Sequence, residues 1–238
     1  MTTDSRSLTE TVKEQNLTSP VEHVLNLIKA GLATAPFCGG IASLMTDYIP
    51  NTKQARMEEF SKRIAADLEA LQDKVDENVI LTDNFAYTFE QCFRGAAENY
   101  QKEKLDAFRG ILINSALGSD LLEDEKEYFL SLVNTLSVIH IRVLKFTALP
   151  TQYLEENGIP PESISGGFSQ FFPLAIPGVN VEVIKSAFGD LYQHGFLSTD
   201  KSIFHTMTSG QGLDLLGDGS RVTEFGKRFI SFCISPCD

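Results

Sequence analysis

The sequence predicts a mainly α-helical protein, in which an N-terminal helical bundle is followed by a smaller α+β domain with a small β-hairpin. Apolar residues recur at helical spacing through most of the chain before Leu136. Proline and glycine become frequent over residues 150–180, and Ser209–Ser220 is rich in Gly and Asp, as hairpin tips are. We therefore expect a mobile arm at 1–20, a bundle at 21–135, and the α+β domain at 136–238 with a Pro-rich insert at 150–180.

The chain has 238 residues, a net charge of −12 at pH 7 and no Trp but 17 Phe, so we expect cores built on Phe and Leu. An acidic chain lacks the basic excess that usually accompanies binding to a phosphate backbone, which makes nucleic acid a poor partner. The segment Met1–Pro20 is polar and resembles no secretory signal, so we expect a cytoplasmic protein, with peripheral membrane association as the alternative.

No catalytic or metal-binding pattern stands out. The four Cys are scattered, the four His are far apart, and there is no phosphate-binding glycine loop or Gly-x-Ser-x-Gly motif. A lone His on an apolar helix, such as His140, is more often a core or boundary residue than a ligand. We expect no enzyme activity and no cofactor.

The most unusual part of the bundle is the apolar segment 21–49. Ser19 and Pro20 form a typical helix start, and Pro36 and the Gly pair divide the run into two short helices. Lys29 opposes membrane spanning, because a central charge costs about 2.5–3.5 kcal/mol on insertion scales. Two hypotheses stay open: a hairpin packed on the bundle, or a segment released into a membrane. The residues that would enter the membrane are Val24, Leu27, Ile28, Leu32, Phe37, Gly39, Gly40, Ile41 and Leu44.

The next helix, capped by Thr52, has the strongest pattern in the chain. Its apolar residues are spaced by three and four, which is typical of a helix-packing seam and would suit contact with a partner or a second copy. The seam residues are Met57, Phe60, Ile64, Leu68, Leu71 and Val75.

Further helices are expected after Asp83, over Glu103–Leu117, and over Glu123–Leu149, where two helices would meet at Leu136–Ser137 with Ser137 as a cap. A ladder of Phe residues at helical spacing in this region predicts core rather than a ligand site.

In the C-terminal part, Asn180 caps a helix that stops at Gly195. Phe196–Ser198 and Arg221–Thr223 are expected to be the strands of the hairpin, and Thr223 then caps a final helix, EFGKRFISFCI. Helix, Gly-rich hairpin and the ending VTEFGKRFISF resemble a winged-helix domain over about residues 136–234. The helical half resembles bacterial proteins that pair a helical region with such a domain.

In DNA-reading winged helices, the second helix enters the major groove and the wing contacts the backbone. That resemblance would assign nucleic-acid contact to Lys185 and Arg221. Winged helices are often protein-binding modules instead, and the acidic charge favours that role here.

Three functional hypotheses follow. The first is a non-enzymatic interaction or scaffold protein that self-associates or docks a protein partner, with the winged-helix-like part as a binding or sensing module. The second is a membrane-active, pore-forming type of bacterial effector that uses residues 21–49. The third is a winged-helix transcriptional regulator.

Overall fold

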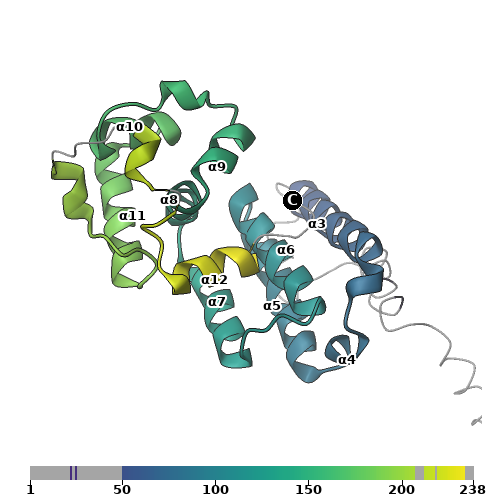
Figure 1. Cartoon of the computed structure of the whole chain (residues 1–238). Coiled ribbons are helices and arrows are strands. Elements are labelled where there is room, and N and C mark those ends of the chain that lie inside the picture. The colour runs from purple at the N-terminus through teal and green to yellow at the C-terminus, as the bar shows by residue number, and fades with distance from the viewer. Residues whose placement is uncertain (1–21, 23–24, 26–49, 207–211, 218, 234–238) are drawn as a thin grey trace, which may run out of the picture. The chain divides into compact units, whose positions relative to one another are not determined.

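The computed structural model describes residues 22, 25, 50–206, 212–217 and 219–233, and their regular structure is helical (Figure 1). The prediction of a mainly α-helical protein is confirmed for these residues. Their α-helices are α3 (Pro50–Ala70), α4 (Glu77–Ile80), α5 (Asp83–Glu98), α6 (Lys102–Ala116), α7 (Glu123–Thr135), α8 (Val138–Ala148), α9 (Pro150–Glu156), α10 (Phe168–Ala175), α11 (Val181–Gln193) and α12 (Glu224–Cys233). Short 3₁₀ helices lie between them: η2 (Gln72–Lys74), η3 (Pro161–Ser163), η4 (Lys201–His205) and η5 (Gly212–Leu215). The arm predicted at 1–20 lies outside the described residues.

The described residues form two compact units, each with its own core. Unit 1 holds residues 22, 25, 50–100 and 108–130. Unit 2 holds residues 101–107, 131–206, 212–217 and 219–233.

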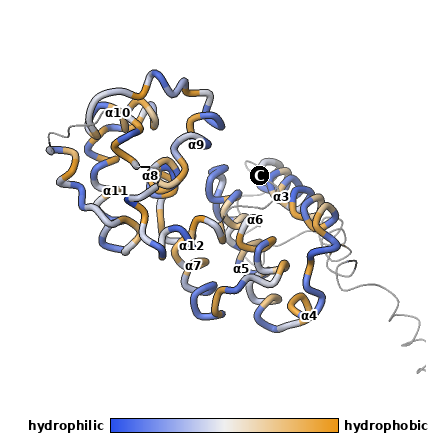
Figure 2. Tube along the Cα trace, viewed as in Figure 1, coloured by the Kyte–Doolittle hydropathy of each residue, from blue (hydrophilic) through white to orange (hydrophobic). Residues whose placement is uncertain are grey.

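Unit 1 is built on amphipathic helices, and Figure 2 shows hydrophobic and hydrophilic residues alternating along them. Helix α5 packs against both α3 and α4. The Phe60 ring of α3 meets the Phe93 ring of α5 edge-on, with centroids 5.3 Å apart. At the start of α5, the Thr82 side chain accepts a hydrogen bond from the Phe85 N–H, which satisfies a donor that the helix itself leaves unpaired.

Unit 2 is organised around helix α8, which packs against α11 and α9, while α10 packs against α11 and η4 (Figure 1). Its core is an aromatic cluster whose members are almost completely buried: Phe146, Phe168, Phe171, Phe172, Phe188 and Phe204. Three of these residues come from α10, so the Pro-rich stretch supplies the centre of the core rather than a peripheral insert. Pro residues restrict its helices to short lengths, but they do not prevent the stretch from packing.

The expected β-hairpin and winged-helix architecture are wrong: the described residues contain no β-strand. The predicted strands meet only at one antiparallel bridge, between Leu197 and Val222. The described residues between them form η4 and η5, and neighbouring residues there are buried in pairs, Ile203 with Phe204 and Leu215 with Leu216. A strand would place adjacent side chains on opposite faces, so it could not bury both members of such a pair in one core.

Candidate functional site

Three of the six residues of the predicted seam are buried in the core of unit 1. Phe60, Ile64 and Leu68 are at most 2% exposed in the unit 1 core, and Met57 is half-buried. Helix α3 ends at Ala70, so the half-buried Leu71 and Val75 lie beyond it rather than on one continuous face. A partner therefore cannot contact Phe60, Ile64 and Leu68 in this fold.

The nine residues predicted to enter a membrane lie outside the described residues. Within the described part, no single helix meets the length and hydropathy expected of a membrane span, although α7 and α8 do so as a pair bent by 119°. Both helices contribute fully buried residues, such as Phe129, Val133, Val143 and Phe146, as core helices do.

The two residues predicted to contact nucleic acid are both engaged within unit 2. The Lys185 ammonium lies 2.8 Å from the Glu182 carboxylate, one turn away on α11. The Arg221 guanidinium donates to the Leu215 carbonyl and lies 5.3 Å from the centre of the Phe168 ring. Burial also lowers the pKa of Arg221. These contacts give Arg221 a structural role in holding η5 against the aromatic core.

Exposed and half-buried apolar residues lie on the two segments of unit 1 that meet where α4 contacts the α6–α7 connection. The Asp76 N–H donates to the Ala116 carbonyl at 2.9 Å, and a Cβ added to Gly118 would lie 3.9 Å from a Val79 methyl group. Leu81 and Leu122, which extend these two segments, are 71% and 75% exposed. We call the apolar residues of these two segments the leucine edge, and its members, none of them buried, are Val79, Leu81, Leu117, Leu121 and Leu122.

The two segments that carry the leucine edge are acidic, and we call their carboxylates the acidic border. Residues 76–83 and 117–124 contain six carboxylates and no Lys or Arg: Asp76, Glu77, Asp83, Asp120, Glu123 and Asp124. The Asp76 carboxylate caps α4 by accepting from the Asn78 N–H at 2.9 Å. Glu123 pairs with Lys126 at 2.8 Å. Exposed apolar side chains and carboxylates on the same two segments suit a partner segment that is apolar and positively charged.

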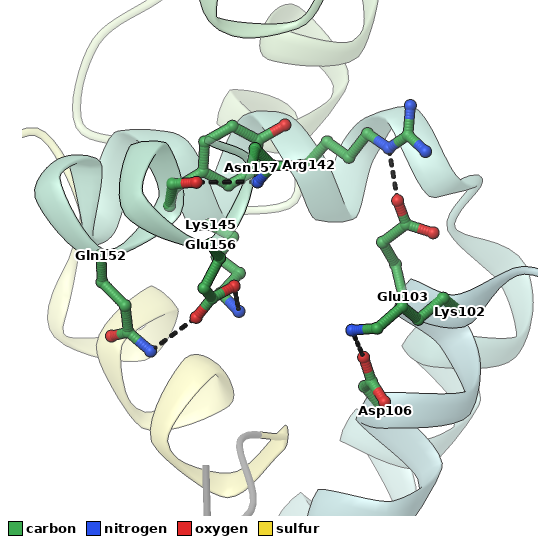
Figure 3. Close-up of polar contacts among 9 residues, drawn as sticks. Lys102, Glu103, Asp106, Arg142, Lys145, Gln152, Glu156 and Asn157 are labelled. Carbon is green, nitrogen blue, oxygen red and sulfur yellow. Dashed lines mark hydrogen bonds and ion pairs between the residues drawn. The ribbon is translucent and has the colours of Figure 1, made fainter. Parts of the chain in front are cut away.

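Unit 2 contains a cluster of ionisable side chains from α6, α8 and α9 (Figure 3). Arg142 donates to Glu103 at 2.5 Å, and Lys102 donates to Asp106 at 2.6 Å. The Glu156 carboxylate accepts from Lys145 at 2.6 Å and from Gln152 at 2.8 Å. Desolvation raises the pKa of Glu156, but these hydrogen bonds outweigh it and the pKa is lowered. Since each of these carboxylates has a cation beside it, the cluster ties helices together rather than presenting a free acid or base.

Two buried groups lie close to this cluster. Burial raises the pKa of Tyr153 to about 12, with a smaller opposing effect from the Arg142 charge. Burial lowers the pKa of Lys104, whose ammonium donates to the Asn134 carbonyl at 3.0 Å, near the C-terminus of α7. A cation at this position is favourable because helix carbonyls are unpaired and partly negative there.

Ser137, His140 and Asp190 form a further polar group, which the sequence did not predict. The Ser137 hydroxyl lies 2.7 Å from Nδ1 of His140, and Nε2 of the same ring lies 3.2 Å from the Asp190 carboxylate. The spacing Ser-x-x-His at a helix start was the available signal for the first pair. The third member lies far along the sequence, on α11, and only the packing of α11 on α8 brings it near. No group of three or more His, Cys, Asp and Glu suited to a metal ion occurs in the residues that the structure describes.

Comparison with protein-family models, curated proteins and solved structures found no match. Function is therefore inferred from the residues and their geometry alone.

Proposed function

We propose that this protein is an interaction protein that docks a basic, amphipathic segment of a partner protein on the leucine edge of unit 1. The observation that carries the proposal is the exposure of Leu81 and Leu122 on two segments that meet in unit 1 and that also carry the acidic border. Burying a fully exposed Leu side chain contributes about 1.5–3 kcal/mol, so two such residues can anchor a short helix or peptide.

The charge on this surface selects the partner. Two copies meeting through the leucine edge would bring their acidic borders together, and like charges that face each other oppose association. A partner with Lys or Arg around an apolar stripe would gain attraction at the border and apolar burial at the centre. The proposal therefore favours a different, basic protein over a second copy of this chain.

The test is fluorescence anisotropy with a labelled amphipathic peptide of Lys and Leu, against the full chain. Leu81→Ser with Leu122→Ser should weaken binding at least tenfold, and higher salt should weaken it further. Leu174→Ser is the matched control, because Leu174 is also exposed (47%) but lies in unit 2. Binding that is unchanged by the double variant, or lost equally in the control, would contradict the proposal. A charged substitution in the α3 seam, such as Leu68→Asp, would not test docking, because Leu68 is a core residue and the variant would disrupt unit 1.

A second candidate function rests on the apolar run at 21–49, whose length approaches that of a bilayer span. A membrane-active protein would float with liposomes and release an entrapped dye, and Ile41→Asp would abolish both effects while Ile41→Leu would not. Protein that stays unbound, with no dye released, would argue against this second function.

A further inference from the structure

Ser137, His140 and Asp190 form a continuous hydrogen-bonded chain in unit 2. Ser137 is the N-cap of α8 and is exposed, His140 lies one turn into the same helix, and Asp190 is on α11. The His140 side chain is only 16% exposed, whereas that of Asp190 is 51% exposed. The imidazole is therefore held between a hydroxyl and a carboxylate, both of which reach solvent.

The contacts around the ring define which nitrogen carries the proton. The backbone N–H of Ser137 points at Nδ1 of His140, with nitrogen atoms 3.2 Å apart, and an N–H can only donate. Nδ1 is therefore the acceptor and Nε2 carries the hydrogen, which it donates to Asp190. In this tautomer the Ser137 hydroxyl, whose oxygen lies 2.7 Å from Nδ1, shares the single Nδ1 lone pair with that N–H.

Hydroxyl, imidazole and carboxylate in this order are the elements of an activated nucleophile. The ring can accept the hydroxyl proton at Nδ1 when that atom gives up its hydrogen bond from the Ser137 N–H, and Asp190 can stabilise the imidazolium that results. The N-terminus of α8 adds hydrogen-bond donors. The first helical hydrogen bond runs from the His140 N–H to the Ser137 carbonyl at 3.0 Å, and the N–H groups of Val138 and Ile139 precede it. Such N–H groups point out of the helix end and suit a developing negative charge.

Helix capping explains only part of this arrangement. A Ser at the N-cap and a side chain three residues later that accepts from its N–H form a capping box. A Gln or Glu would serve that purpose equally well. Capping does not account for Asp190, which approaches the other ring nitrogen from a different helix and orients the imidazole toward Ser137.

We propose that Ser137 is a nucleophile toward carboxylic esters with good leaving groups, with His140 as its base and Asp190 as a positioning residue. The Ser137 oxygen forms a bond to the ester carbonyl carbon, its proton passes to Nδ1 of His140, and the imidazolium returns that proton to the departing alcohol. Water then cleaves the acyl–serine ester by the same route, so that ester and water yield acid and alcohol. This activity is independent of the docking function proposed for unit 1.

The experiment is labelling of the full chain with a fluorophosphonate, read by mass spectrometry of the modified peptide. In this reaction a Ser–O–P bond forms, the P–F bond breaks and the hydroxyl proton leaves with fluoride. Ser137 should be labelled much faster than Ser186, an exposed serine on α11 that serves as an internal control. Hydrolysis of p-nitrophenyl acetate, measured in parallel, should be lost in Ser137→Asn, which retains a good N-cap.

The decisive variant is His140→Gln, because Gln keeps the capping box but cannot act as the base. Its labelling rate should fall on the order of 10²-fold while its thermal unfolding stays close to that of the parent protein. Asp190→Asn should lower the rate, because it removes the carboxylate that holds the imidazole in place and stabilises the imidazolium in the reaction. Absence of labelling at Ser137 in the unmodified protein, or an equal rate in His140→Gln, would overturn the proposal. Ser137 and His140 would then serve only as the capping box of α8.

Discussion

The phenol of Tyr153 makes unit 2 sensitive to alkaline pH. Its ring packs against Phe146 with centroids 5.5 Å apart, and burial raises its pKa to about 12, above the ordinary value near 10. A group whose pKa is higher in the folded state stabilises the fold fully below the unfolded pKa and loses this contribution as the pH rises through the folded pKa. We expect the stability of unit 2 to decline between about pH 10 and 12.

The check is equilibrium unfolding by urea from pH 9 to pH 11.5, for the parent protein and for Tyr153→Phe. The two proteins differ only at position 153, so the difference between the two slopes isolates the Tyr153 phenol. The parent should lose stability more steeply than the variant. Equal slopes would show that the Tyr153 phenol titrates normally.

Gly95 on α5 is required by the close approach of Phe108. A Cβ at position 95 would lie 2.3 Å from the Phe108 ring, so Gly95→Ala must displace a fully buried aromatic side chain. Overpacking of this kind costs about 1–3 kcal/mol in the free energy of unfolding. Gly167→Ala, whose added methyl group meets nothing within 4 Å, should cost clearly less in the same denaturation experiment. A milder effect at position 95 than at position 167 would contradict this reading of the contact.

Helices α3 and α6 are joined by a buried ion pair. The Asp67 carboxylate accepts from Nε and an amino group of Arg109 at 2.6 and 2.7 Å, and the side chains of Arg109 and Asp67 are only 8% and 6% exposed. Removing one member leaves a buried charge without its partner, which costs about 3–5 kcal/mol. We expect Arg109→Met to lower the free energy of unfolding of unit 1 by this amount, as measured by urea denaturation.

Two control variants test whether the loss of stability comes from the buried ion pair. Asp67→Leu combined with Arg109→Met should recover part of the lost stability, because no buried charge remains. Arg94→Ala breaks an exposed pair with Glu90 and should cost about 1 kcal/mol or less. If Arg109→Met were as mild as Arg94→Ala, the buried pair would contribute no more than a surface one.

The described residues form two compact units, each with its own core, so we expect the protein to unfold in more than one step. Phe172 is fully buried in the aromatic cluster of unit 2, and Phe→Ala in such a site costs about 3–5 kcal/mol. In Phe172→Ala, hydrogen exchange by mass spectrometry should show lost protection in peptides of unit 2, while residues 50–98 keep theirs. Leu174→Ala, at an exposed neighbour, should change neither unit. Uniform loss of protection along the chain would indicate a single cooperative structure.

Several helices could be predicted closely because their ends are encoded locally. Asn180 caps α11 by accepting from the Glu182 N–H at 2.8 Å, and Gly195 follows the helix with the positive φ of 79° that glycine readily adopts. Ser137 likewise begins α8 as expected. Apolar spacing correctly placed Phe60, Ile64 and Leu68 on one face of α3, but spacing does not reveal whether that face meets the chain itself or a partner.

The prediction of a β-hairpin was wrong because the structure of this region depends on residues far away in the sequence. Glycine and Asp residues after Thr206 indicate turns, but they do not indicate whether the flanking residues pair as strands. The need to bury adjacent residues such as Ile203 and Phe204 is set by the aromatic core of α10 and α11, which lies at a distance in the sequence. The winged-helix resemblance depended on the same local signals.

The sequence by itself determined that this chain is helical, acidic and rich in Phe, and where several of its helices begin and end, because capping and periodicity act over a few residues. Only the tertiary structure decided that Phe60, Ile64 and Leu68 of the predicted seam are core residues and that Lys185 and Arg221 are engaged within unit 2. It also decided that Leu81 and Leu122 extend segments that meet in unit 1. It also brought Asp190 to His140. Contacts between distant residues depend on how all the helices pack together, and no short stretch of sequence contains that information.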